Sequence, residues 1–427
     1  MQFAELLRKY MSDYVYTPGH LARLSGVPKM TLVHWLNGDV KKPRLALEVV
    51  RLASALRLSE VEANDLLQAA GFGSVNRVYT SLVNEADKVL FANWLEKKGQ
   101  GNNGAPFQAV PKPGVFVGRE ALLKQLSQQL AASTHERLYA LVGMAGVGKT
   151  ALAAELAYQL RFQFPDGVLW MRLDGSDPMS ILQLFAIAYG QDVSPFGDIQ
   201  SRSQAVRMLL AGKRALMVLD NAQFSEQIRS LLPPTGPCAV LVTTRRHDMA
   251  VLRGSSRFMV EPFDEQGEES VALFSQILGW DRVQAEREAL LQIARLLGHL
   301  PLALEIAAYR LADEPGLGTT KFLAMLRTEK KQLAELAYGQ ETVRAAFESS
   351  YALLSPAQQS FFAALGQLPE RAFQVKAAAA AANLATEVAD QLLRQLYALS
   401  LVHQGRNGRY RLLPLLHQFA QEKCQAS

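Results

Sequence analysis

Cysteine is nearly absent from this chain. Only Cys238 and Cys424 occur among 427 residues, and neither stands in a CxxC or Cys/His spacing. This pattern excludes a disulfide framework and offers no zinc site. Long apolar runs are absent too: no stretch of about 18 apolar residues occurs, and residues 1–14 carry charges within a helical period, unlike a signal peptide. We therefore expect a soluble, cytoplasmic protein without a membrane partner.

Charge of one sign is also scarce. The net charge is +5 with a pI of about 9.1, so composition alone does not imply a nucleic-acid partner. No internal repeat of roughly 20–50 residues occurs, which excludes a solenoid or a propeller. Hydrophobic residues make up 49% of the chain, enough for several folded domains.

Turn signals and hydrophobic periodicity divide the chain into six segments. In the middle, β-branched and apolar runs alternate with helical periods, which is typical of a parallel sheet with crossover helices. Near the C-terminus, two alternating strands flank Asn407 and Gly408, a hairpin signal that indicates a winged helix. The predicted segments are a helical domain over 1–72, a helical extension over 73–95, a flexible linker over 96–113, a sheet domain over 114–260, a helical subdomain over 261–338 and a winged-helix subdomain over 339–427. The predicted fold class is multidomain α/β plus all-α.

The sequence GMAGVGKT, residues 143–150, follows a predicted strand and precedes a predicted helix. It has the form G-x-x-x-x-G-K-[ST] of the phosphate-binding P-loop. Its glycines let backbone N–H groups point at phosphates, and the helix N-terminus adds a positive field. We expect ATP or ADP here, with Lys149 reaching the β- and γ-phosphates and the Thr150 hydroxyl binding Mg²⁺. The predicted nucleotide contacts of the loop are Gly143, Met144, Ala145, Gly146, Val147, Gly148, Lys149, Thr150 and Ala151.

A second anchor for Mg²⁺ is expected where another strand ends, because an acidic residue there can hold the metal shell. Asp220, in the run LMVLDN, fits this role. Arg245 follows the buried run CAVLVTT, and the topology predicts that it lies beside the γ-phosphate. The alternative for Arg245 is a solvated loop cation. If the site hydrolyses ATP, its predicted catalytic residues are Lys149, Asp220 and Arg245.

Five motifs in this order resemble the NB-ARC core of the STAND class of signalling NTPases. They are VFVGRE, GMAGVGKT, LMVLDN, LVTTR and GHLPLAL, and the resemblance covers residues 114–427. It implies a P-loop nucleotide-binding domain, a helical subdomain and a winged helix that close over ADP, then open with ATP and self-associate.

The same resemblance assigns further residues to the nucleotide. It implies that Val117, Gly118 and Arg119 lie near the adenine, that Pro301 packs against the nucleotide, and that Arg245 senses the γ-phosphate. For Pro301 the alternative is a helix-breaking turn residue.

Two positions depart from the family pattern. Asn221 stands where the family usually has a second acidic residue, and its amide cannot take a proton from water at neutral pH. ATP hydrolysis is therefore expected to be slow at most. Residues 412–414 are Leu-Leu-Pro where the winged helix often carries Met-His-Asp, so the histidine clamp on ADP is expected to be missing. We interpret His417, further along, as a surface or core histidine.

The first segment has the internal spacing of a helix-turn-helix. Ala22 stands where two helices would cross, Gly26 at the turn, and Leu32 and Trp35 on the buried face of a second helix that starts at about Pro28. Residues 1–72 resemble the lambda-repressor-like (XRE) family, which implies double-stranded DNA as a partner. The predicted DNA contacts are Lys29, Met30, Thr31 and His34 on the second helix, and Lys41, Lys42 and Arg44 in the loop after it.

The charge distribution agrees with this prediction, since nine basic residues oppose five acidic ones up to Glu60. The alternative is a protein-interaction module with a solvated basic face. A second candidate surface for DNA is the C-terminal wing, which carries Arg406, Arg409 and Arg411.

Together these motifs predict a nucleotide-switched transcriptional regulator that oligomerises on ATP binding, so that several weak DNA readers act together. The alternative is a defence or death-type switch whose N-terminal helices bind a protein effector. A DNA-dependent ATPase motor is disfavoured by Asn221. The sequence lacks the repeat-built sensor that usually follows such a core, so we expect sensing by a longer parent chain or by a separate partner protein.

Overall fold

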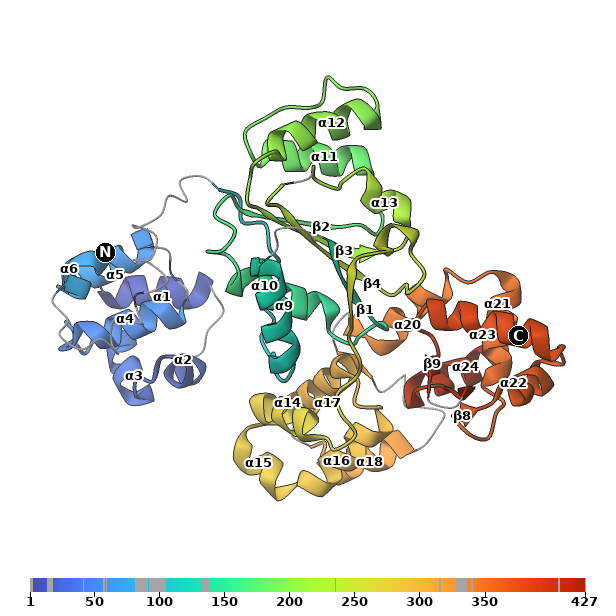
Figure 1. Cartoon of the computed structure of the whole chain (residues 1–427). Coiled ribbons are helices and arrows are strands. Elements are labelled where there is room, and N and C mark those ends of the chain that lie inside the picture. Colours follow the sequence, from blue (N-terminus) through green and yellow to red (C-terminus); the bar gives the residue numbers. More distant parts are fainter. Residues whose placement is uncertain are drawn as a thin grey trace. The chain divides into compact units, whose positions relative to one another are not determined.

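The computed structural model describes residues 3–13, 18–40, 42–56, 58, 60–80, 91, 105–132, 138–234, 236–314, 316–327, 336–338, 341–405 and 408–426. Contacts divide the chain into two compact units, residues 1–103 and 104–427 (Figure 1). Helices and strands together confirm the predicted multidomain α/β plus all-α class.

The first unit is helical. Its helices are α1 (Phe3–Asp13), α2 (Pro18–Ser25), α3 (Lys29–Asn37), α4 (Ala46–Ala55), α5 (Glu60–Ala69) and α6 (Val75–Thr80). Gly26 adopts a left-handed φ of 69° in the turn between α2 and α3, and Leu32 and Trp35 are buried. The core extends past the predicted boundary at residue 72, because Val75 and Phe91 are also fully buried in it. Most of the predicted helical extension lies outside the described residues.

The second unit contains a five-stranded parallel sheet in the order β2-β3-β4-β1-β5. Its strands are β1 (Leu138–Val142), β2 (Val168–Arg172), β3 (Leu216–Ala222), β4 (Ala239–Thr244) and β5 (Ser256–Met259). Every residue of β4 is buried, as expected for a strand covered on both faces. Helices α9 (Glu120–Ala132) and α10 (Lys149–Gln159) cover one face. The other face carries α11 (Pro178–Ile187), α12 (Ile199–Leu210), α13 (Ser225–Arg229) and the short η3 (Ala250–Leu252) (Figure 1).

Helices follow the sheet. They are α14 (Glu268–Leu278), α15 (Trp280–Ala285), α16 (Arg287–Leu296), α17 (Pro301–Asp313) and α18 (Thr319–Arg327). Leu290, Ala303 and Leu304 are buried between them, because apolar residues recur at helical spacing. A two-stranded ladder of β6 (Ala337–Tyr338) and β7 (Glu341–Thr342) leads onward.

The last part combines helices with a small antiparallel sheet in the order β8-β10-β9. Its elements are α20 (Val343–Tyr351), α21 (Pro356–Leu365), β8 (Ala372–Phe373), α22 (Val375–Ala382), α23 (Thr386–Ala398), β9 (His403–Gln404), β10 (Tyr410–Arg411) and α24 (Pro414–Ala426). The strands β9 and β10 pair on either side of the predicted turn, although residues 406–407 lie outside the described residues. Among the described helices, none is long and apolar enough to cross a membrane.

The prediction of a flexible linker over 96–113 is wrong for residues 105–113. Phe107 forms a parallel bridge with Val168, whose N–H donates to the Pro106 carbonyl at 2.8 Å. The Phe107 ring meets Tyr158 at a centroid distance of 5.0 Å. The segment thus covers β2, the edge strand of the sheet. Its proline-rich sequence has no period to reveal this, and residues 96–104 lie outside the described residues.

Candidate nucleotide-binding site

The loop between β1 and α10 requires small residues. A Cβ on Gly143 would lie 2.3 Å from the Val260 carbonyl oxygen, so no side chain fits there. Gly146 and Gly148 adopt φ angles of 77° and 93°, the left-handed region that favours glycine. The chain therefore turns tightly from the sheet into α10, as a phosphate-binding loop does.

A cavity of about 440 Å³ opens beside this loop. This volume lies in the range of small-molecule sites, roughly 300–1,000 Å³. One end is mostly apolar and is lined by Pro113, Val115, Phe116, Val117, Phe263 and Leu273, with Arg119 over the Phe263 ring. The other end is polar and is lined by Lys149, Thr150, Arg172, Asp220, Asn221, Thr243 and Arg245. Such a division suits a ligand with an aromatic base at one end and phosphates at the other.

Lys149 is buried at the polar end. Its Nζ donates to the carbonyl oxygens of Gly143 and Met144, both at 2.8 Å. Burial, and then the positive charge of Arg245, lower the pKa of Lys149 to about 7. Without nucleotide, the Lys149 amine is therefore only partly protonated at neutral pH.

Thr150 and Asp220 both line the cavity and contact each other. The Thr150 hydroxyl lies 2.9 and 3.2 Å from the two carboxylate oxygens of Asp220, and the Thr243 hydroxyl donates to the same carboxylate. A hydroxyl beside a carboxylate is a set of hard oxygen donors, and Mg²⁺ prefers such ligands. These two residues therefore fit the predicted metal shell.

Arg245 follows β4 and reaches across to α20. Its Nη1 lies 2.6 Å from both the Ser349 and Ser350 hydroxyl oxygens and 3.2 Å from the Ala346 carbonyl oxygen. Arg245 is thus not the solvated loop cation of the alternative interpretation. It lines the cavity while its guanidinium is held by helix α20.

The helical subdomain closes another side of the cavity. Pro301 is the first residue of α17 and lines the cavity together with Leu302 and Glu305. The Leu302 N–H donates to the Gly146 carbonyl oxygen at 3.1 Å, which joins this helix directly to the P-loop. Pro301 therefore starts a helix and also faces the cavity. The two interpretations of this proline are compatible.

Most of the predicted nucleotide contacts line this cavity, but three do not: Gly118, Gly143 and Met144. Gly118 faces the Glu269 side chain, because a Cβ built on it would lie 2.2 Å from the carboxylate. Gly143 and Met144 act through their carbonyl groups, which hold Lys149. Arg119 lies over the Phe263 ring at 5.0 Å and donates to the Glu261 carbonyl oxygen.

Asn221 is the next-to-last residue of β3 and has a left-handed φ of 57°; its N–H donates to the Thr243 hydroxyl at 2.8 Å. Burial raises the pKa of the nearby Asp174, but hydrogen bonds from Arg172 and Asn221 outweigh burial and hold that pKa below its usual value. The Asn221 amide is therefore occupied by a neighbouring carboxylate.

His417 and Arg411, two residues near the C-terminus, both contact other parts of the chain. His417 Nε2 lies 3.0 Å from the Leu368 carbonyl oxygen, outside the nucleotide cavity, in agreement with its interpretation as a structural histidine. Arg411 pairs with Glu265 at 2.8 Å, and its side chain is 48% exposed. Arg406 lies outside the described residues.

On the first unit, the predicted DNA contacts of α3 lie opposite its buried residues. Lys29, Met30 and His34 are exposed, with Met30 at 64%, and Thr31 is half-buried. The His34 ring lies 2.9 Å from the Asp39 carboxylate. Lys42 and Arg44 are exposed in the following loop, whereas Lys41 lies outside the described residues.

The sheet order, the glycine-rich loop after β1 and the acidic end of β3 define the second unit as a P-loop NTPase fold. A sequence model of the NB-ARC domain matches residues 119–283. The chain therefore carries the NB-ARC core of the STAND class, as the five motifs predicted.

The chain is similar to several known proteins. The chain is 40% identical over 313 residues to the regulatory protein AfsR of Streptomyces griseus. The aligned residues make up 71% of this chain and 32% of that protein. It is 30% identical over 312 residues to a proposed HTH-type transcriptional regulator of Mycobacterium bovis. These residues make up 69% of this chain and 34% of that protein. A solved STAND protein with a tetratricopeptide repeat sensor from Pyrococcus horikoshii is 18% identical, with a TM-score of 0.32, and covers 74% of this chain and 44% of that one. The chain spans about a third of the length of these curated relatives.

Nucleotide binding should take up a proton above neutral pH. Lys149 has a pKa of about 7 without nucleotide, and phosphates that accept its hydrogen bonds favour the charged form. At pH 8 we expect uptake approaching one proton per ADP, and little uptake from this group at pH 6. Calorimetry in buffers of different ionisation enthalpy measures it. Uptake that is absent at pH 8 would contradict the placement of Lys149 on the phosphates.

The same shift affects stability without nucleotide. The folded pKa of about 7 lies below the ordinary value of 10.5, so the unfolded chain binds more protons between these values. The contribution of Lys149 to folding stability therefore rises with pH across this window.

Proposed function

We propose that this chain is the nucleotide-controlled core of a transcriptional regulator: ATP or ADP binds beside the P-loop, and the bound nucleotide sets how the winged-helix part docks. The observation that carries the proposal is the position of Arg245. It lines the phosphate end of the cavity and simultaneously contacts Ser349 and Ser350 on α20. One side chain thus connects the ligand site to the element that would move.

Further contacts join the same two regions. The His247 N–H donates to the Ala398 carbonyl oxygen at 2.8 Å, and the Ser400 hydroxyl donates to the Arg245 carbonyl oxygen at 2.6 Å. The His247 ring packs on Tyr397 with centroids 4.7 Å apart. These contacts follow directly after β4, so a shift of Arg245 would act on all of them.

Mg²⁺ is part of the proposal, because Thr150 and Asp220 offer hard oxygen ligands beside the phosphate end. The metal would neutralise the charge of a triphosphate. We propose that hydrolysis is slow at most, since Asn221 is an amide that hydrogen-bonds Asp174. Binding and exchange of nucleotide would then set the state, and the ATP state would self-associate.

We propose that the N-terminal unit reads double-stranded DNA through α3. The support is the exposure of Lys29, Met30 and His34 on one side of a helix whose other side is buried, together with relatives named as regulators. The α2-turn-α3 arrangement, with Gly26 in the left-handed region, matches a helix-turn-helix reader.

Salt dependence tests the DNA assignment. We expect the log affinity of the full chain for duplex DNA to fall linearly with log salt, with a slope of about −0.9 per neutralised phosphate. The double variant Lys29→Ala/Thr31→Ala should weaken DNA binding about tenfold, without changing nucleotide affinity. Lys124→Ala is the matched control, since it removes an exposed positive charge from α9 in the second unit. Unchanged DNA binding by the double variant would instead favour a protein effector as the partner of this unit.

A further inference from the structure

Arg172 is a cation at the phosphate end that no motif predicts. It is the last residue of β2 and lies in register with Asp220 on β3. Residues in register on neighbouring strands point to the same face of a sheet. Arg172 accordingly lines the same cavity as Lys149 and Asp220.

The strand order places Arg172 opposite Arg245. Strand β3 lies between β2 and β4, so the two arginines approach Asp220 from either side. The two arginines are close enough to interact electrostatically. Burial and then the charge of Arg172 lower the pKa of Arg245, whereas the charges of Asp174 and Asp220 raise it. Neighbouring strands are about 4.8 Å apart, so the end of β2 is about 14 Å from the end of β1. A ligand seated on the P-loop would meet Arg172 only with its outermost phosphate.

Asp174 fixes the orientation of this arginine. Arg172 Nε donates to one Asp174 carboxylate oxygen at 2.6 Å, and Nη2 donates to the other at 2.8 Å. A guanidinium has five N–H donors, so this fork leaves both hydrogens of Nη1 and one of Nη2 available. The Arg172 side chain is 68% exposed, and these donors are therefore open to a ligand.

We propose that Arg172 binds the terminal phosphate of a nucleoside triphosphate and that Asp174 is its positioning residue. The inference rests on the proposed nucleotide site and makes it specific. Lys149 and the loop amides would bind the phosphates common to ADP and ATP. Arg172, together with Arg245, would distinguish the triphosphate from the diphosphate.

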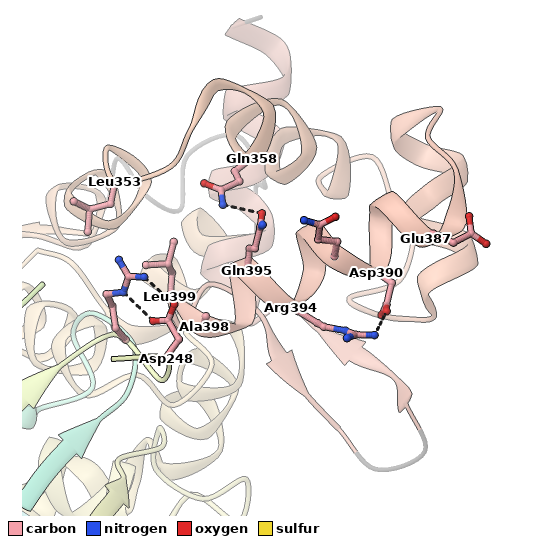
Figure 2. A pocket seen from close by; sticks show the side chains of 11 residues that line it. Asp248, Leu353, Gln358, Glu387, Asp390, Arg394, Gln395, Ala398 and Leu399 are labelled. Atoms are coloured by element: carbon pink, nitrogen blue, oxygen red, sulfur yellow. Dashed lines mark hydrogen bonds and ion pairs between the residues drawn. The ribbon is translucent and has the colours of Figure 1, made fainter. Parts of the chain in front are cut away.

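The segment after β4 offers a matched control for Arg172. Arg246 and Asp248 form the same fork after β4, at 2.9 and 2.8 Å. This pair lines a different cavity, of about 960 Å³, against α23, where Asp248 lies near Ala398 and Leu399 (Figure 2). Arg246→Ala thus removes an arginine with the same local bonding that does not face the P-loop.

The test compares ADP with ATPγS by calorimetry on the full chain. For Arg172→Ala we expect ATPγS affinity to fall about tenfold, with ADP affinity within about twofold of wild type. Asp174→Asn should reduce ATPγS affinity less, and again spare ADP. Arg246→Ala should change neither. Equal loss for both nucleotides, or no loss for ATPγS, would overturn the inference. Failure of wild type to bind either nucleotide would instead overturn the proposed site itself.

Discussion

Lys149→Ala should abolish measurable nucleotide binding, with the Kd for both ADP and ATP raised at least about 100-fold. Hydrogen bonds to charged groups contribute about 1.5–3 kcal/mol each, and Lys149 would supply two or more to adjacent phosphates. The ammonium already lies at the loop, held by two carbonyl oxygens at 2.8 Å. It needs only a side-chain rotation to exchange these for phosphate oxygens. Isothermal calorimetry with purified, nucleotide-free protein measures the effect.

Lys112→Ala is the control for this experiment. Lys112 pairs at 3.0 Å with Glu155, which lies on α10 as Lys149 does. Lys112 is not among the residues that line the cavity. Its removal should leave nucleotide affinity within about twofold, since its side chain does not contribute to the cavity. A thermal melt of both variants checks that they fold. Wild-type affinity in Lys149→Ala would mean that the glycine-rich loop binds no phosphate.

The core of the site was predictable because its signals are local or follow from strand ends. The P-loop residues are consecutive, and Asp220 and Arg245 each follow a buried apolar run. Parallel strands end at one edge of the sheet, so these side chains had to converge. Their approach in the structure agrees with that argument, while their roles on a nucleotide stay predictions.

The remaining contacts could not be read from the sequence. Arg172 and Asp174 carry no motif, and their position depends on β2 being the neighbour of β3. Ser349 and Ser350 are 104 and 105 residues from Arg245, and a pair of serines in a helix indicates nothing about a distant arginine. The segment 105–113 reads as a linker because edge pairing by backbone groups leaves no side-chain period.

Removing the two serines that contact Arg245 and removing Arg245 itself should change the affinity for ATPγS in opposite directions. Ser349→Ala/Ser350→Ala removes two of the three acceptors that α20 offers the guanidinium and leaves the Ala346 carbonyl oxygen at 3.2 Å. A phosphate then no longer competes with two hydroxyl groups, so we expect ATPγS to bind about five- to tenfold more tightly, at about 0.5–1.5 kcal/mol per hydrogen bond. Arg245→Ala should weaken ATPγS binding by at least tenfold. ADP affinity should change little in either variant.

The same serine variant should loosen helix α20 and the elements tied to it without any nucleotide. Helix α20 is tied to α24 by Lys423 with Glu348 at 2.7 Å and by Arg344 with Glu422 at 2.6 Å, so α20 carries its neighbours with it. Faster amide exchange should therefore spread over α20 and residues 398–400, which hydrogen-bond the segment after β4. Ser360→Ala, an exposed serine on α21, is the control. If the serine variant and Arg245→Ala both weaken ATPγS binding equally, Arg245 only stabilises the fold. If the serine variant strengthens binding and Arg245→Ala weakens it, nucleotide and α20 compete for Arg245, which is the condition for a switch.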